Sequence, residues 1–273
     1  MKVLLFSLLF YLPCDAQELY SFVENYVPGE TVKYKEDSQM SFEITGRLTE
    51  NGNSNINTVK CLGYEDNFLL LEETMIDLVA TTKTLGEMSA DHETNSLLGV
   101  PYTLYIDTLS GMIDHIETEY KEHEELIMTL VMGMESSMEN KIYPYGKNAI
   151  NIKVGDSWSP PPDTLEMFMG DQGDANYMIF NSIYTLVKVK QKKGINIAYI
   201  TGKYKARADV EFLQDSNFFE GTMQGTMKDK IRYNVDEKKE ILNKLSCTMD
   251  WDLKFEGENM SIRFEMISNE KRI

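Results

Sequence analysis

The stretch that decides the fold lies near the C-terminus and reads MDWDLKFEGENMSIRFEM over residues 249–266. Apolar and polar residues alternate through Met249–Phe255 and again through Met260–Met266, and the polar run EGEN separates the two segments. A period of two is that of a β-strand, and a polar interruption containing Gly is typical of a turn. The stretch predicts a β-hairpin with one apolar and one polar face, as in antiparallel sheets that pack on one side.

The same alternation continues toward the N-terminus. Apolar residues between Met223 and Val235 share one face of a predicted strand, and another strand follows a turn at residues 192–194. Further strands are expected at residues 57–64, 66–73, 75–83, 101–107 and 112–118, and the Asn-Gly pair within residues 49–54 predicts a turn. The predicted fold class is therefore mainly β, an antiparallel curved sheet or an open barrel.

One segment has a different period. Between residues 119 and 139 the apolar residues fall at helical spacing, and acidic residues load the first turns, where they suit the helix dipole. We expect one substantial helix near residues 119–139 and a shorter one over residues 17–26. Residues 159–177 begin with Ser-Pro-Pro-Pro-Asp and are expected to form a long loop.

Residues 1–16 have the organisation of a secretory signal peptide. Lys2 precedes an apolar run that ends at Leu12, and this run is shorter than the roughly 20 residues that span a bilayer. Cys14 and Ala16 then place small residues where cleavage is expected. The chain is predicted to be exported, periplasmic or extracellular. Lipidation at Cys14 would tether it to a membrane instead, but Pro13 stands where a small residue is expected.

Composition narrows the function without choosing one. The formal net charge is −17, and so acidic a surface disfavours nucleic acid as a partner because it repels phosphate. Two cysteines, Cys61 and Cys247, follow the signal peptide. In an oxidising compartment they form either a disulfide or two separate buried thiols, and their spacing does not decide between the two.

Two local patterns occur twice in the same order. Gly29-Glu30-Thr31-Val32 resembles the segment at Gly155, 126 residues later, and the turn at Asp107 resembles the turn at Asp236, 129 residues later. The near-equal offsets favour two related halves, residues 17–145 and 146–273, that form one compact unit. The alternative is that hairpins reuse Asp and Gly because both suit turns.

The segment Ile152-Lys153-Val154-Gly155-Asp156-Ser157-Trp158 resembles an uncharacterised family of exported bacterial β-rich proteins. These proteins carry a V-K-x-G-D-S-W-like motif after a linking helix. The resemblance covers most of the mature chain and implies a β-rich exported fold without an assigned activity. The chain departs from the family at Glu240, where a turn Gly is usual and which aligns with Gly111. Strands wrapped on a helix are also similar to the open barrels of periplasmic lipoprotein carriers, at the level of fold.

The Gly155–Trp158 motif is interpreted as structural. Gly155 suits the turn, Asp156 or Ser157 suits a hydrogen bond to local backbone N–H groups, and Trp158 suits a core position. The alternative is a chemical role for Asp156 and Ser157 beside Trp158.

No catalytic or metal-binding constellation emerges from the sequence. His92, His115 and His123 are far apart, and His123 lacks the second His four residues on that a zinc-binding helix needs. No P-loop or Gly-x-Ser-x-Gly motif occurs. The sequence therefore predicts neither enzyme activity nor a cofactor nor a metal site.

Methionine is unusually frequent, with 17 residues. Its flexible side chain fits varied apolar shapes, so clustered methionines can line a hydrophobic groove. The ligand-binding residues expected on the helix and loop are Met128, Leu130, Met134, Met138, Met167 and Met169. Two functions follow: an exported envelope protein that binds an apolar or lipid-like ligand between sheet and helix, or a structural or protein-interaction module of the envelope without such a ligand.

Overall fold

The computed structural model describes residues 18–44, 47–84, 87–89, 94–128, 140–169, 174–214, 217–255 and 258–273. The predicted signal peptide, with Cys14, lies outside these residues. Most of the described chain enters one antiparallel sheet of 13 strands, which confirms the predicted fold class. Within the described ranges, no helix has both the length and the apolar character needed to cross a membrane.

The strands are long. In chain order they are β1 (Thr31–Ile44), β2 (Arg47–Glu65), β3 (Phe68–Thr84), β4 (Glu87–Ser89), β5 (Pro101–Asp107), β6 (Ile113–Glu117), β7 (Ser157–Trp158), β8 (Asp163–Met169), β9 (Asp174–Lys192), β10 (Ile195–Gln214), β11 (Asn217–Asn234), β12 (Lys239–Phe255) and β13 (Glu258–Arg272). Across the sheet the order is β6-β5-β3-β2-β1-β13-β12-β11-β10-β9-β7, with β4 beside β3 and β8 beside β9. The first and last long strands are therefore neighbours, and the sheet does not close into a barrel.

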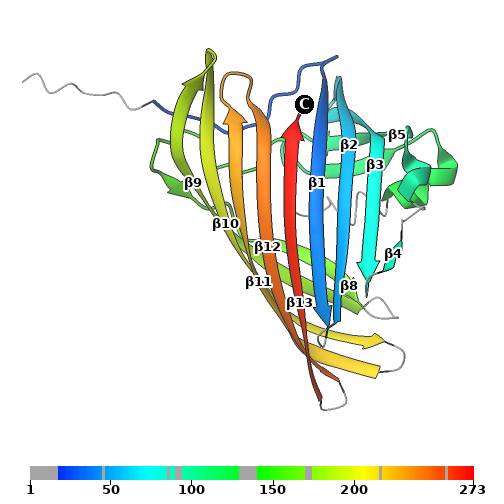
Figure 1. The fold of residues 1–273 in the computed structure, drawn as a ribbon. Coiled ribbons are helices and arrows are strands. Elements are labelled where there is room, and N and C mark those ends of the chain that lie inside the picture. The colour runs from blue at the N-terminus through cyan, green and yellow to red at the C-terminus, as the bar shows by residue number, and fades with distance from the viewer. Residues whose placement is uncertain are drawn as a thin grey trace, which may run out of the picture.

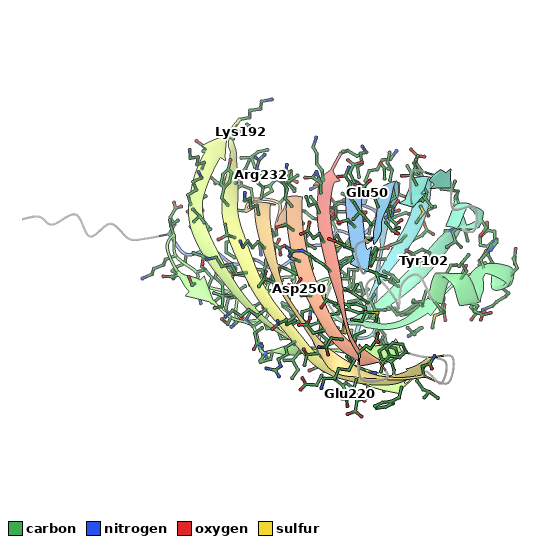
Figure 2. All side chains as sticks on the ribbon, turned by 60° about the horizontal axis from the view of Figure 1, so that its bottom comes forward. Glu50, Tyr102, Lys192, Glu220, Arg232 and Asp250 are labelled. Carbon is green, nitrogen blue, oxygen red and sulfur yellow. The ribbon has the colours of Figure 1, made fainter. Side chains whose placement is uncertain are left out.

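The sheet is strongly curved. Figure 1 shows the long strands side by side and narrowing downward, with β8 passing behind them. We call the end with Lys192 and Arg232 the upper end and the end with Glu220 the lower end; Figure 2 labels all three residues. The face that carries the buried side chains is called the inward face, and the opposite face the outward face.

Two apolar clusters fill the upper end. In the first, Phe22 is fully buried, stacks on Trp158 with ring centroids 5.8 Å apart and meets Tyr233 edge-on at 5.3 Å. In the second, residues of β2, β3 and β5 pack with Leu97 of the 3-10 helix η1 (Thr94–Leu97) and with Ile127. The upper end is thus a closed core, built where crossing segments cover the sheet.

The helix expected over residues 17–26 is wrong. Residues 18–27 are not helical, and the amides of Tyr20 and Phe22 donate to the carbonyls of Ile152 and Ala149. An extended backbone makes these bonds and carries Phe22 into the core. The helix expected over residues 119–139 begins as the 3-10 turn η2 (Lys121–His123) and continues as an α-helix over 124–128. Residues 129–139 lie outside the described ranges.

Two expected interruptions of the sheet are also wrong. The predicted turn at residues 49–54 is part of β2, where Asn51 and Asn53 pair with Met40 and Ser38 of β1. Pairing with β1 on one side and β3 on the other overrides the weak strand preference of Asn and Gly. The loop expected over residues 159–177 contains β8, which pairs with residues 174–180 of β9. The separate strands expected at residues 66–73 and 75–83 are one strand, because β3 runs through position 74 without a break.

The turn between β5 and β6 recurs between β11 and β12. Asp107 accepts hydrogen bonds from the amides two and three residues later, at 3.1 and 2.9 Å, and Asn234 does the same at 3.1 and 3.2 Å. The backbone is left-handed at Gly111 (φ 79°) and at Lys238 (φ 55°). The structural counterpart of Gly111 is therefore Lys238, and the alignment with Glu240 is wrong.

A second turn is repeated with the same backbone bonds. The amide of Gly29 donates to the carbonyl of Cys61 at 2.8 Å, and the amide of Cys61 donates to the carbonyl of Glu30 at 2.9 Å. Gly155 and Asp156 bond Leu186 in the same way at 2.8 and 3.1 Å. The counterpart of Asp107 is thus Asn234 and not Asp236, and the division into two related halves stays a prediction.

The disulfide interpretation of Cys61 and Cys247 is wrong, because both thiols are free and buried. Cys61 lies on β2 and Cys247 on β12, with β1 and β13 between them. Three strand spacings amount to about 14 Å, whereas a disulfide joins Cα atoms within about 7 Å. The register separates them further, because Cys247 is level with Asn51 through Met266 and Met40.

The N-terminal segment should be necessary for the upper core. Phe22→Ala is expected to lower the free energy of unfolding by about 3–5 kcal/mol, because it removes a fully buried ring that stacks on Trp158. Leu19→Ala, three residues earlier and 54% exposed, is the matched control and should cost less than about 0.5 kcal/mol. Urea unfolding measures both; equal effects would contradict the placement of this segment.

Candidate functional site

The inward face changes character toward the lower end, where it becomes rich in methionine and aromatic side chains. Seven of the 17 methionines of the chain meet there. We call this the methionine-rich surface; it consists of Met40, Phe42, Met178, Phe180, Ala206, Ala208, Val210, Phe212, Met223, Met227, Leu245, Cys247, Met249, Trp251, Leu253, Met260, Ile262, Phe264 and Met266.

Strand register brings these residues together from six strands. Met249 of β12 is paired with Phe264 of β13, and Phe264 is paired with Phe42 of β1, with ring centroids 5.0 Å apart. On its other side Met249 is paired with Gly225 of β11. A Cβ at Gly225 would lie 2.7 Å from the Cγ of Met249, so the glycine leaves space for the methionine.

The methionine-rich surface is only partly covered. Met249, Trp251, Ile262, Phe264 and Met266 are half-buried, although they lie among fully buried neighbours. In the described part of the chain, the long strands make their main contacts with their hydrogen-bonded neighbours and not with a second layer. Apolar surface left in water forgoes about 25 cal/mol of stabilisation per square ångström. Contiguous exposed apolar surface of this kind marks binding sites.

Polar residues cross the inward face along the upper border of this surface, where Asn51 is level with Met40 and Asp229 with Leu245. We call them the polar row; it consists of Asp229, Asn243, Ser268, Glu36, Asn55, Asn53 and Asn51. Within it Glu36 accepts hydrogen bonds from Ser268 Oγ at 2.9 Å and from Asn55 Nδ2 at 3.2 Å. The row separates the closed upper core from the methionine-rich surface.

Several polar atoms of the inward face lack partners among the described residues. The Oδ1 atoms of Asn51, Asn53, Asp229 and Asn243 are buried and accept no hydrogen bond from the described residues, and the indole N–H of Trp251 donates none. A buried acceptor without a donor costs about 1–3 kcal/mol. Four unpaired acceptors on one face therefore make a site that suits hydrogen-bond donors, such as ligand hydroxyl or ammonium groups or water.

Asp229 is the most deeply buried member of the row, at 5% exposure. Its Oδ2 accepts a hydrogen bond from the hydroxyl of Tyr204, which is itself bonded to the hydroxyl of Tyr184 at 2.7 Å. Burial raises the pKa of Asp229 to about 6, and the bond from Tyr204 partly opposes this shift. Near neutral pH the carboxylate is charged and adds a negative potential to the row.

Of the six residues predicted to bind ligand, the structure describes Met128, Met167 and Met169, and none of these three belongs to the methionine-rich surface. Met128 ends the described part of the helix and is 39% exposed. Leu130, Met134 and Met138 lie outside the described residues. Met167 and Met169 belong to β8, where they pair with Asn176 and Asp174 of β9.

The methionine-rich surface is formed by other methionines. Five of the seven were expected on apolar strand faces, whereas Met40 and Met178 were not; the five are Met223, Met227, Met249, Met260 and Met266. Their signal was present in the alternation at residues 223–235 and 249–266.

The Gly155–Trp158 motif has a structural partner for each residue. Gly155 has a φ of 96°, and Asp156 Oδ2 accepts the amide of Lys153 at 2.9 Å. Ser157 Oγ lies 2.8 Å from Thr185 Oγ1. Trp158 is buried, and its indole N–H donates to the carbonyl of Tyr145 at 3.0 Å. These contacts attach β7 to β9 and to the upper core.

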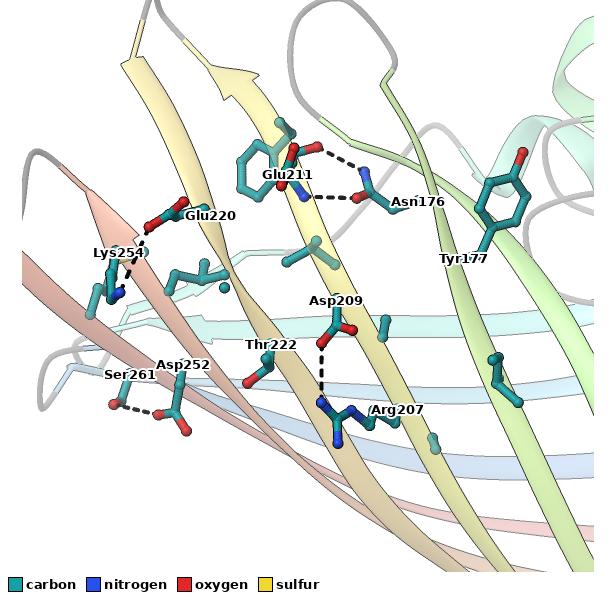
Figure 3. Close-up of a pocket in the computed structure, with 18 of the residues that line it drawn as sticks. Asn176, Tyr177, Arg207, Asp209, Glu211, Glu220, Thr222, Asp252, Lys254 and Ser261 are labelled. Carbon is teal, nitrogen blue, oxygen red and sulfur yellow. Dashed lines mark hydrogen bonds and ion pairs between the residues drawn. The ribbon is translucent and has the colours of Figure 1, made fainter.

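A groove of about 1460 Å³ lies at the lower end of β9–β13 (Figure 3). Strand alternation places its charged side chains on the outward face, and Val210, Leu253 and Met260 of the methionine-rich surface also contribute to its lining. The charges pair locally: Arg207 with Asp209 at 3.4 Å and Lys254 with Glu220 at 3.7 Å. Its lining includes no histidine. Across the described ranges, no three His, Cys, Asp or Glu side chains are grouped to hold a metal ion.

Comparison with known proteins gives a likeness of fold. No protein-family model and no curated protein matches the chain. A structure titled "lipid-protein interactions in lipovitellin" is similar, with a TM-score of 0.50 and 10% identity over 91% of this chain and 25% of that one. An outer membrane channel from Pseudomonas putida F1 has a TM-score of 0.27 and 6% identity over 92% of this chain and 97% of that one. The chain thus spans about a quarter of the lipovitellin chain that it matches.

The raised pKa of Asp229 predicts that this buried carboxyl lowers the free energy of unfolding by an amount that depends on pH. Between about pH 4 and pH 6 the folded protein retains a proton that the unfolded chain releases, so the free energy of unfolding falls as pH rises. The neutral side chain in Asp229→Asn does not titrate. The stability of this variant relative to wild type should therefore increase from about pH 4 to pH 7, by up to about 3 kcal/mol. Urea unfolding across this range measures the difference; a constant difference would contradict the burial of this carboxyl.

Proposed function

We propose that this protein is an exported envelope protein that binds an amphipathic lipid on the inward face of its sheet. The acyl chain lies on the methionine-rich surface and the polar end meets the polar row. One observation carries the proposal: a half-buried apolar surface borders four buried acceptor oxygens that accept no hydrogen bond from the described residues. An amphipathic ligand satisfies both features at once.

The composition of the surface suits acyl chains. Methionine is unbranched and polarisable, so neighbouring methionines adjust to chains of different length and curvature. Aromatic rings at Phe42, Phe264 and Trp251 add large flat contact area. Binding would remove these side chains from water, and the gain grows with the apolar area covered.

The polar row favours a particular kind of headgroup. It presents acceptor oxygens and the carboxyls of Asp229 and Glu36, whereas Arg272 and Lys239 lie nearer the upper end and are paired with Glu30. Such a row attracts hydroxyl or ammonium donors and repels a carboxylate or phosphate. A monoacylglycerol or a long-chain amine therefore fits better than a fatty acid of the same length.

The exported location rests on the organisation of residues 1–16. The likeness to lipovitellin, whose structure describes lipid-protein interactions, is consistent with a lipid-binding role for a sheet of this fold, as an analogy of fold. The alternative role is an envelope interaction module without a small ligand.

Displacement of the neutral fluorophore Nile red by monooleoylglycerol, oleylamine and oleate tests the proposal. Monooleoylglycerol and oleylamine should displace the dye at lower concentration than oleate. Met249→Lys places a charge on the methionine-rich surface and should weaken monooleoylglycerol binding about tenfold or more. Thr248→Lys adds the same charge one residue away, on the outward face, and should leave binding unchanged.

Circular dichroism checks that both variants are folded, and Met266→Gln repeats the test with a neutral side chain. Absence of binding by the wild-type protein would overturn the proposal and favour the interaction module. Equal effects of the Met249 and Thr248 variants would place the ligand elsewhere.

A further inference from the structure

Basic side chains collect on the outward face of β10 and β11. Lys203, Lys205 and Arg207 alternate along β10, and Lys228, Lys230 and Arg232 alternate along β11; we call these six residues the basic face. All six are exposed. The outward positions of the two strands over residues 199–207 and 224–232 include no carboxylate, because Asp229 points inward.

Most cations of the basic face have no compensating charge among the described residues. Lys203 is paired directly with Lys228 across the strands, and Lys230 with Lys244 of β12. Like charges directly opposite each other destabilise a sheet. Within the described residues, Arg207 is the only one of the six with an ion pair, to Asp209 at 3.4 Å. Such an arrangement suits a negatively charged partner that covers several cations together.

The positive charge of the basic face is opposite in sign to the net charge of the chain. The chain has 44 acidic and 27 basic residues, so a cluster of cations without carboxylates departs from the overall composition. The surrounding negative surface repels an anionic partner, whereas the basic face attracts it. The charge asymmetry therefore orients the protein as it approaches an anionic surface.

An exposed aliphatic strip adjoins the basic face on β9. Ile179, Ile183 and Val187 are 49%, 53% and 48% exposed. Ile183 is paired with Lys203, and Ile179 with Arg207. Cations beside exposed aliphatic side chains match the interface of a bilayer, where phosphates lie next to acyl chains. A nucleic acid or an acidic peptide would use the cations but leave the strip in water.

We propose that the basic face docks on an anionic lipid surface, with the cations at headgroup phosphates and the aliphatic strip of β9 at the acyl boundary. This surface lies on the outward face, opposite the methionine-rich surface, so the two proposals stand or fall separately. Docking would hold the protein against a membrane while the inward face stays free.

Sedimentation with vesicles of phosphatidylglycerol and phosphatidylcholine, compared with phosphatidylcholine alone, tests the proposal on the mature chain. The wild-type protein should bind the anionic vesicles, bind the neutral ones far less and lose binding as salt rises. The triple variant Lys203→Glu, Lys228→Glu, Lys230→Glu should bind the anionic vesicles at least about 100-fold more weakly than the wild-type protein. The control Lys33→Glu, Lys153→Glu, Lys271→Glu makes the same charge change at exposed sites elsewhere and should bind more strongly than the triple variant.

Monooleoylglycerol binding and circular dichroism, measured on both triple variants, show whether the fold and the inward face are intact. A second pair of changes, Ile179→Ser with Ile183→Ser, should weaken vesicle binding while leaving its salt dependence in place. Wild-type protein that ignores anionic vesicles, or two triple variants that bind alike, would overturn the proposal. Binding to heparin as tight as to vesicles, unaffected by the isoleucine changes, would assign the face to a polyanion instead of a lipid surface.

Discussion

The pairing of β1 with β13 is the interaction on which the rest of the structure depends. Eleven residue pairs, from Tyr34–Arg272 to Ile44–Ile262, join the first long strand to the last. Without them the chain would form two sheets, each with a long exposed edge. The methionine-rich surface crosses this seam through Phe42 and Phe264, and the polar row crosses it through Glu36 and Ser268. Both features of the proposed site therefore exist only when the seam is closed.

The two ends of the sheet are built differently. At the upper end, extended segments and short helices cover the inward face, and burial there is strong enough to raise the pKa of Glu24 to about 7. At the lower end the described chain provides less cover, and methionines and aromatic rings are left half-buried. A closed upper core keeps the curved sheet rigid, while the lower end retains the apolar surface that a ligand can cover. The upper part of the strands thus stabilises the fold, and the lower part of the same strands carries the proposed binding surface.

Local alternation was sufficient to predict the mainly β fold and the C-terminal hairpin, because each face of the hairpin is uniform over residues 249–255 and 260–266. It failed at Asn51 and Asn53, whose own preference is for turns and which adopt a strand because β1 and β3 pair on both sides. It failed again at Phe22, where a partner more than 100 residues away dictates an extended backbone. The methionine-rich surface was not predicted, because the sequence reasoning considered methionines of the helix and loop and not those of the strands. Its members come from six strands, and only the register shows that Met249, Gly225 and Phe264 meet.

The chain contains two tryptophans, and they lie in different parts of the structure. Trp158 is buried in the upper core, whereas Trp251 is half-buried on the methionine-rich surface. Fluorescence of the single-tryptophan variants Trp158→Phe and Trp251→Phe, titrated with a monoacylglycerol brominated on its acyl chain, is the most direct test, because bromine quenches an indole on contact. The account predicts saturable quenching of Trp251 and little quenching of Trp158. Quenching of Trp158 alone, or of neither residue, would contradict an acyl-chain site on the inward face.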